Sequence, residues 1–211
     1  MQYLSQRLAS KPAPGRGGDP APGTLPAPQR ERILDAVEHL IAVRGCAGTS
    51  IETIVKAAGV SSVTFYEFFE GKEGCFVAAF DRAVAAVATE VEEAAADLSW
   101  AEQISTGLRT ALAVVVADPD RARLCLVEAQ TGGPELSARF EAALDRVAAK
   151  LRAGRSLETA PPDLPATHEE ATAGALVWLV RERLERGGEE SVEALYPQLV
   201  DIALAPYLGD G

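Results

Sequence analysis

The chain has 211 residues, 47% of them hydrophobic and 24% charged, which is enough to bury a core in one domain or in a small domain plus a medium one. No apolar run approaches the ~20 residues that span a bilayer, and the first residues lack a stretch of signal-peptide length, so we expect a cytoplasmic protein without membrane contact. The formal net charge of −11 by itself argues against a nucleic-acid ligand.

The first segment contains six prolines and four glycines between Gln2 and Pro28 and shows no periodic apolar pattern. This composition predicts a disordered tail over residues 1–29. Helical periodicity begins at Arg30 and ends at Gly45, with one apolar stripe formed by Ile33, Val37, Leu40 and Ile41.

Two short helices follow. Ser50 is a good N-cap for the first of them, and Gly59 suits the left-handed conformation at its end. The second is predicted from Ser62 to Phe68. Two short helices joined by a glycine-containing turn are typical of a helix-turn-helix unit, so we predict a three-helix DNA-binding head over residues 30–76.

The remaining residues, 77–211, are helical in pattern and show no strand-like alternation. The last two helices are expected over Thr167–Arg186 and from Glu189 to about Ala205. The predicted fold is therefore all-α with about nine helices, and residues 77–211 are expected to form a helical ligand-binding and dimerisation domain.

The second short helix offers hydrogen-bonding groups that suit phosphate oxygens or base edges, from Ser61, Ser62, Thr64 and Tyr66. Phe65 and Phe69, four residues apart, are expected to point the other way and anchor the helix. Lys72, at the start of the next helix, can meet a phosphate together with the free backbone N–H groups there.

The charge distribution is compatible with this interpretation. Residues 1–80 contain 8 Lys and Arg and 8 Asp and Glu, whereas residues 81–211 contain 12 and 23, so the whole excess of negative charge lies beyond residue 80. Such segregation is typical of a head that contacts DNA and an acidic body held away from the phosphates, although the head is neutral rather than basic.

The stretch GVSSVTFYEFFEGKEGCF, residues 59–76, resembles the signature of the tetracycline-repressor (TetR) family, and the resemblance extends over about residues 30–80. It implies a helical dimer whose last two helices form the interface. It also implies DNA contacts at Ser50, Ser61, Ser62, Val63, Thr64, Tyr66 and Lys72.

A body of some 130 residues after the head must dimerise, sense a ligand, or do both. Candidate ligand-lining side chains are Trp100, Leu108, Leu112, Leu126, Gln130, Phe140, Leu144 and Trp178, with ordinary core packing as the alternative for each of them. Because the stretch 171–180 is apolar almost all round, we expect burial against a second subunit, with candidate interface positions at Leu176, Val180, Leu184, Leu195, Leu199 and Ile202.

We interpret the chain as a homodimeric DNA-binding transcriptional regulator, a repressor released from a double-stranded inverted-repeat operator by an unidentified small-molecule effector. Two alternatives stay open. One is an interaction protein that has lost operator binding, which Glu52 and the neutral head favour. The other is a helical enzyme, against which stands the lack of a catalytic triad, metal-ligand spacing or phosphate loop; no catalytic residue, metal or cofactor is expected.

Overall fold

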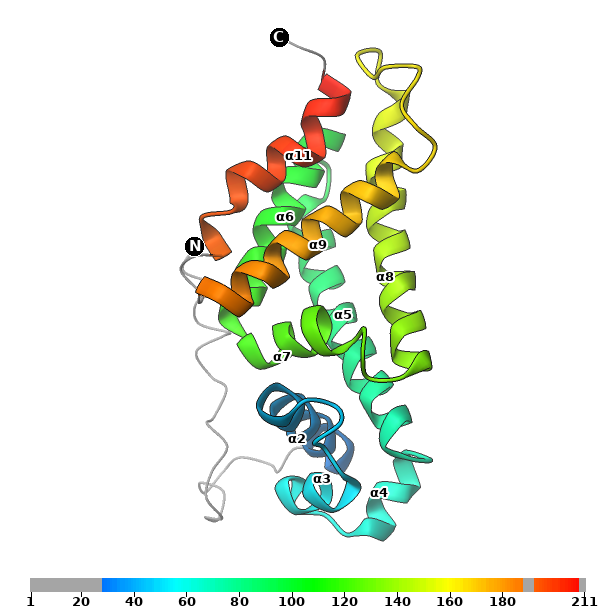
Figure 1. Ribbon diagram of the computed structural model, residues 1–211, viewed down its shortest axis with the longest axis vertical. Coiled ribbons are helices and arrows are strands. Elements are labelled where there is room, and N and C mark those ends of the chain that lie inside the picture. Colours follow the sequence, from blue (N-terminus) through cyan, green and yellow to red (C-terminus); the bar gives the residue numbers. More distant parts are fainter. Residues whose placement is uncertain (1–27, 188–191, 209–211) are drawn as a thin grey trace.

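The computed structural model describes residues 28–187 and 192–208, and every regular element in these two ranges is helical (Figure 1). They hold nine α-helices with one π-helical turn and one 3-10 turn: α2 (Gln29–Arg44), α3 (Ile51–Ala58), α4 (Ser62–Phe68), α5 (Lys72–Ala95), α6 (Trp100–Ala117), α7 (Pro119–Arg123), η1 (Leu124–Glu128), α8 (Pro134–Arg152), η2 (Ala153–Ser156), α9 (His168–Gly187) and α11 (Tyr196–Leu208). The prediction of an all-α fold with about nine helices is confirmed.

The helices α2, α3 and α4 form a head at the lower end of the molecule, and α5 runs from this head into the body above it (Figure 1). Ile33, Ile54, Phe65 and Phe80 are fully or almost fully buried in the head and belong to one apolar core. That core continues into the body through Leu124, Leu136 and Phe140. Because α5 crosses the predicted boundary at residue 76 without a break, the division into two domains stays a prediction.

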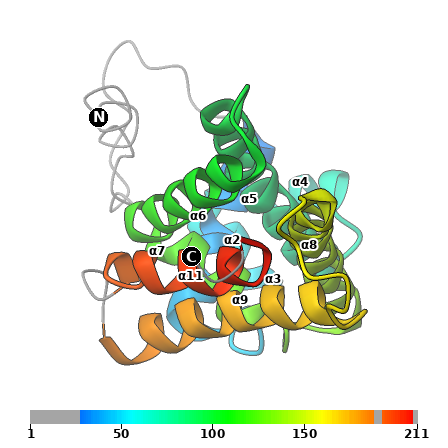
Figure 2. The same ribbon diagram turned by 90° about the horizontal axis from the view of Figure 1, so that it is seen from above.

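A second apolar core lies higher in the body and joins α6, α8, α9 and α11. Its members include Leu112, Leu151, Leu176 and Leu199. Seen along the long axis, α9 and α11 lie side by side on one side of the body, with α6 next to α11 (Figure 2). None of the helices within the described ranges is long and apolar enough to cross a membrane.

The last helix differs from its predicted bounds. Residues 188–191 lie outside the described part of the chain, and Ala194 and Leu195 form a turn before α11 begins at Tyr196. Of the tail predicted over residues 1–29, residues 1–27 also lie outside the described part, whereas Gln29 is already the first residue of α2. Pro197 explains the break, because it has no N–H to donate to residue 193 in a continuous helix but fits well in the first turn of a new one. The predicted single helix from Glu189 to about Ala205 is therefore interrupted at Ala194 and Leu195, and its predicted start at Glu189 lies outside the described residues.

Candidate DNA-binding surface and ligand cavity

The two short helices of the head are capped by their own hydroxyl groups. The backbone N–H of Thr53 donates to the Ser50 hydroxyl at 3.3 Å, and the Ser50 N–H donates to the Thr53 hydroxyl at 3.1 Å. Gly59 ends α3 with a φ of +63°, which a residue with a Cβ adopts only at a cost. Ser61 then begins α4 by accepting a hydrogen bond from the Thr64 N–H at 3.0 Å. These caps define both ends of the turn between the helices.

The helix α4 has a buried face and an outward face. Phe65 is fully buried and Phe69 is only 7% exposed, which confirms that these two rings anchor the helix. On the other face, Ser62 is exposed, Val63 is 71% exposed and Tyr66 is 58% exposed. Exposed methyl groups and a phenol gain no stability from burial at such a surface, but they suit contact with thymine methyl groups and polar base edges.

Lys72 stands beside the start of α3. Its Nζ lies 3.5 Å from the carbonyl oxygen of Thr49 and 5.8 Å from the centre of the Phe76 ring, so the ammonium is held next to Ser50. Gly71 before it offers no side chain to the first N–H groups of α5. The structure therefore brings a cation and free backbone donors to the end of the molecule that carries α4, an arrangement that suits a phosphate.

A largely apolar cavity of about 370 Å³ lies in the body between α5, α6, α7, η1, α8 and α9. Its walls are mostly Val, Leu, Ile and Ala side chains, and its polar lining consists of Glu92, Gln103, Arg121, Arg146 and Lys150. Size and composition match those of small-molecule sites, which are mainly apolar with a few placed polar groups.

The predicted ligand residues fall into three groups. Leu108 and Leu126 line the apolar cavity. Trp100 and Leu112 do not line it: Leu112 is buried in the second core, and Trp100 packs on Tyr207 at 5.0 Å between ring centres and donates its indole N–H to the Lys150 carbonyl at 2.9 Å. The other four, Gln130, Phe140, Leu144 and Trp178, line a separate pocket.

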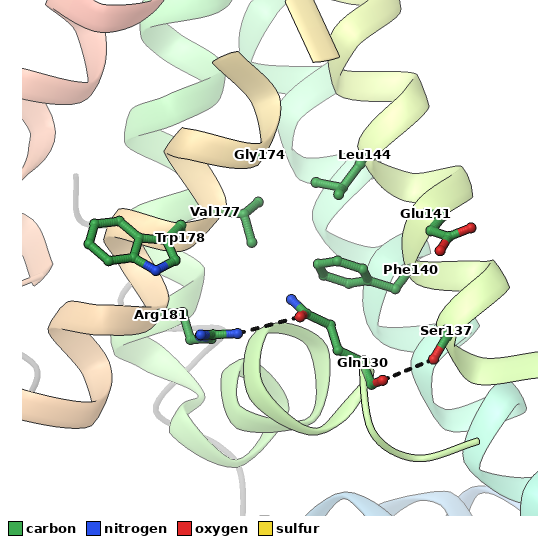
Figure 3. A pocket seen from close by; sticks show the side chains of 9 residues that line it. All are labelled: Gln130, Ser137, Phe140, Glu141, Leu144, Gly174, Val177, Trp178 and Arg181. Atoms are coloured by element: carbon green, nitrogen blue, oxygen red, sulfur yellow. Dashed lines mark hydrogen bonds between the residues drawn. The ribbon is translucent and has the colours of Figure 1, made fainter. Parts of the chain in front are cut away.

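This second pocket, of about 560 Å³, is a more open and more polar hollow between α8 and α9 (Figure 3). Arg181 faces Gln130 with 3.4 Å between Nη1 and Oε1, and Ser137 donates to the Gln130 carbonyl at 3.0 Å. Trp178 lies at its edge and is 52% exposed, which is unusual for so large an apolar side chain.

Four of the predicted dimer-interface residues face the core of the single chain: Leu176, Val180, Leu195 and Leu199 are buried there. Buried side chains offer little surface to a second copy, which speaks against these four positions. Leu184 and Ile202 are half-buried at the edge of the same core. These two residues, and the choice of the last helices as the interface, stay predictions.

The junction between head and body contains an ion cluster around one buried carboxylate that the sequence did not predict. Glu38 of α2 is only 1% exposed, and Arg82 of α5 donates to its Oε1 at 2.7 and 3.2 Å. Arg82 also binds Glu31 and Asp35, at 2.8 Å each. These partners are 44 to 51 positions apart in the chain, so no local pattern reveals them.

The α7–η1 segment adds further contacts with α2. His39 Nδ1 lies 2.9 Å from Asp120 Oδ2, and the Cys46 N–H donates to Glu128 Oε2 at 3.0 Å. Arg121 Nη2 lies 3.6 Å from Glu38 Oε2. Residues 119–128 thus contact the head on one side and line the apolar cavity on the other.

The three cysteines are free thiols in apolar surroundings. Burial raises the pKa of Cys46 to about 11, and those of Cys75 and Cys125 to about 12, so all three stay protonated at neutral pH. In the described ranges, no group of three or more His, Cys, Asp or Glu side chains is placed to hold a metal ion.

The head is a helix-turn-helix unit whose second helix faces outward, and it is attached to a helical body with an apolar cavity. This combination is typical of DNA-binding regulators. Residues 33–79 match the model for bacterial regulatory proteins of the tetR family. An uncharacterised HTH-type transcriptional regulator of Mycobacterium tuberculosis is 32% identical over 152 residues, which cover 72% of this chain and 70% of that protein. The chain belongs to the TetR family of transcriptional regulators. The alternative of a helical enzyme is thereby excluded.

Solved structures share the fold. The fatty acid degradation regulator FadR of Bacillus halodurans superposes with a TM-score of 0.74 at 18% identity, covering 86% of this chain and 97% of that one. FadR of Bacillus subtilis, solved in complex with stearoyl-CoA, gives a TM-score of 0.72 at 18% identity and covers 83% and 98%. A TetR-like regulator of Rhodococcus gives 0.69 at 23% identity and covers 89% and 100%.

Proposed function

We propose that the chain is a homodimeric repressor that binds an inverted-repeat operator and is released by an amphipathic small molecule in the apolar cavity. The observation that carries this proposal is the α7–η1 segment, because it lines the cavity and also contacts the head. A ligand that changes the packing of this segment has a short path to the DNA-binding surface.

Operator contact is assigned to Ser50, Ser61, Ser62, Val63, Thr64, Tyr66 and Lys72. The outward face of α4 and the adjacent start of α5 support this assignment, since they carry exposed hydroxyls and methyl groups and a half-buried ammonium at one end of the molecule. Phosphate contacts position such a head, and base-edge contacts from α4 specify the sequence.

The ligand class follows from the cavity wall. Branched aliphatic side chains from five helices enclose a volume within the range of ligand sites, which favours a flexible apolar chain. The structural neighbour solved with stearoyl-CoA supports the same class, because its fold holds an acyl ligand. Of the predicted ligand residues, we assign Leu108 and Leu126 to the ligand site, because they line this cavity. The second pocket, and not the ligand site, is lined by Gln130, Phe140, Leu144 and Trp178.

The dimer is assigned to the outward face of α9. Ala171, Gly174, Ala175 and Trp178 recur there at helical spacing, and the three small residues let a partner helix approach closely. Two heads on a twofold axis would reach successive major grooves about 34–36 Å apart, so the operator should be an inverted repeat.

Ligand entry is proposed to shift α7–η1 against α2 and to rotate α5, which carries both Lys72 and the cavity residue Val84. The two recognition helices then lose the spacing that the operator requires.

An electrophoretic shift and footprinting assay with DNA from upstream of the chain's own gene tests this function. We expect protection of an inverted repeat and its loss when a long-chain acyl compound is added. Absence of any shift at micromolar protein would instead favour an interaction protein that has lost operator binding.

A further inference from the structure

Arg121 belongs to the cavity wall and to the ion cluster between the head and the body at the same time. Its Nη2 is 3.6 Å from Glu38 Oε2 and 3.6 Å from Asp118 Oδ2, so both ion pairs are longer than hydrogen bonds. Within the described ranges, the buried Nε of Arg121 and the buried Oε2 of Glu38 have no hydrogen-bond partner. The guanidinium is thus placed at the cavity with part of its binding capacity unused.

Glu38 does not depend on Arg121 for its charge to be compensated. Arg82 binds the other oxygen of Glu38 through two hydrogen bonds of 2.7 and 3.2 Å. Short charge-assisted hydrogen bonds are much stronger than an ion pair at 3.6 Å. Withdrawal of Arg121 would therefore leave Glu38 paired and the head folded.

The other cations of the cavity are less suited to hold an anion. Arg146 and Lys150 of α8 are exposed, and an ion pair in water gains little. The Arg121 side chain is only 23% exposed, and its surroundings in the cavity are apolar, so a pair formed there is screened less.

We infer that Arg121 is the anion-recognition residue of the cavity, and that the carboxylate of an apolar-chain ligand takes it over from Glu38. The ligand class is a fatty acid rather than a neutral lipid. The regulatory part of this inference rests on the proposed function, whereas the recognition part concerns ligand binding alone.

The competition has a direct structural consequence. Asp120, next to Arg121 in α7, bonds His39 of α2, and Glu128 of η1 accepts the N–H of Cys46 where α2 ends. A guanidinium that turns from Glu38 into the cavity removes one of three polar links between this segment and α2. The lost link is the one that responds to the ligand.

Isothermal titration calorimetry with two matched probes tests the recognition part. Dodecanoate and dodecanol have the same chain and differ in charge. We expect the wild-type chain to bind dodecanoate at least about tenfold more tightly, and Arg121→Met to bind both with equal affinity, because a charge-assisted hydrogen bond is lost. Arg121→Lys should keep part of the preference.

Arg146→Met and Lys150→Met are the controls, since each removes a cation from the same cavity. Both should keep the preference of the wild type for dodecanoate. The assignment to Arg121 is overturned if Arg121→Met keeps the preference for dodecanoate, or if Arg146→Met or Lys150→Met abolishes it. If no saturated fatty acid from 8 to 18 carbons binds the wild type, the ligand class is wrong.

Operator release separates this inference from the proposed function. Arg121→Met lacks the link to Glu38 with or without ligand, so it should bind the operator fragment more weakly than the wild type, by about the factor that saturating dodecanoate causes in the wild type, and dodecanoate should weaken it no further. Release of Arg121→Met and of the wild type at the same dodecanoate concentration would refute the coupling. A wild type that never binds the fragment would refute the proposed function and leave the calorimetric result valid. Far-UV circular dichroism and the Tm check that the variant is folded.

Discussion

The hydroxyl groups of Ser50 and Ser61 already cap helices, so their replacement would change stability and DNA affinity together. Loss of an N-cap hydroxyl costs about 1 kcal/mol of stability. Tyr66 and Lys72 are better probes, because the Tyr66 ring is 58% exposed and the contacts of Lys72 with the Thr49 carbonyl and the Phe76 ring are long, at 3.5 and 5.8 Å. Binding changes at these two positions report DNA contact.

Tyr66→Phe and Lys72→Ala are each expected to weaken operator binding while the far-UV circular dichroism spectrum and the Tm stay near those of the wild type. Lys72→Ala should also lower the slope of log affinity against log salt by about one, because one phosphate contact is lost. Fluorescence anisotropy over a salt series measures both. Arg139→Ala on α8 removes the same charge from the body and should change neither quantity; equal slopes for it and Lys72→Ala would contradict the assignment.

Glu169 gives a prediction about pH. Its side chain is fully buried, which by itself raises its pKa, but hydrogen bonds from Arg155 at 2.7 Å and from the Tyr207 hydroxyl at 2.8 Å outweigh burial and lower the pKa from 4.5 to about 2. A carboxyl with a lowered folded-state pKa stabilises the fold above its unfolded pKa, and this stabilisation is lost as the pH falls through the folded value.

The Tm of the wild type should therefore fall between pH 4.5 and pH 2, and that of Glu169→Gln should fall less over the same range. At pH 7 the variant should be the less stable of the two, because Arg155 loses its charged partner. Differential scanning calorimetry at half-unit pH steps measures the two curves. If the two curves of Tm against pH run parallel, Glu169 is not the source of this pH dependence of stability.

At the scale of elements, caps and periodicity predicted where helices begin and end, because those signals are local. Ser50 and Gly59 marked the two ends of the first short helix, and the structure has α3 between them. Helix pairing is not local. The stretch 171–180 is apolar on almost every side, so nothing in it shows that Leu176 faces the core and Trp178 the solvent. The same limit hid Arg121, whose partner Glu38 is 83 positions away.

The loop before α8 packs against the end of α2 at Gly132. A Cβ added there would lie 2.6 Å from Leu136 Cδ2 and 2.8 Å from Cys46 Sγ, whereas one added at Gly74 meets nothing within 4 Å. Gly132→Ala is expected to destabilise the fold by about 1–3 kcal/mol through overpacking. Gly74→Ala should stabilise it by up to about 1 kcal/mol, since alanine is the better helix former. Urea unfolding compares the two, and equal effects would contradict the close packing.

At the scale of the whole molecule, the neutral head has a structural explanation. Glu31, Asp35 and Glu38 bind Arg82, and Arg82 lies just beyond the first 80 residues whose charges balance. Arg121 adds a second cation beside Glu38. The carboxylates of α2 are therefore compensated in part by cations from the body. A charge count along the chain cannot show this, because the compensating residues come from distant positions.

Assembly carries the last prediction, because one recognition helix reads too few base pairs for selectivity and operator binding requires two heads. Trp178→Glu places a charge on the outward face of α9 without entering the core, so we expect a folded monomer in sedimentation velocity at micromolar concentration, with operator affinity lost at the same time. Leu199→Glu, at a buried position, should instead unfold the chain. Val43→Glu alters an apolar side chain of α2 that is 65% exposed and should leave the dimer intact. A Trp178→Glu chain that still sediments as a dimer would place the interface on another face of the molecule.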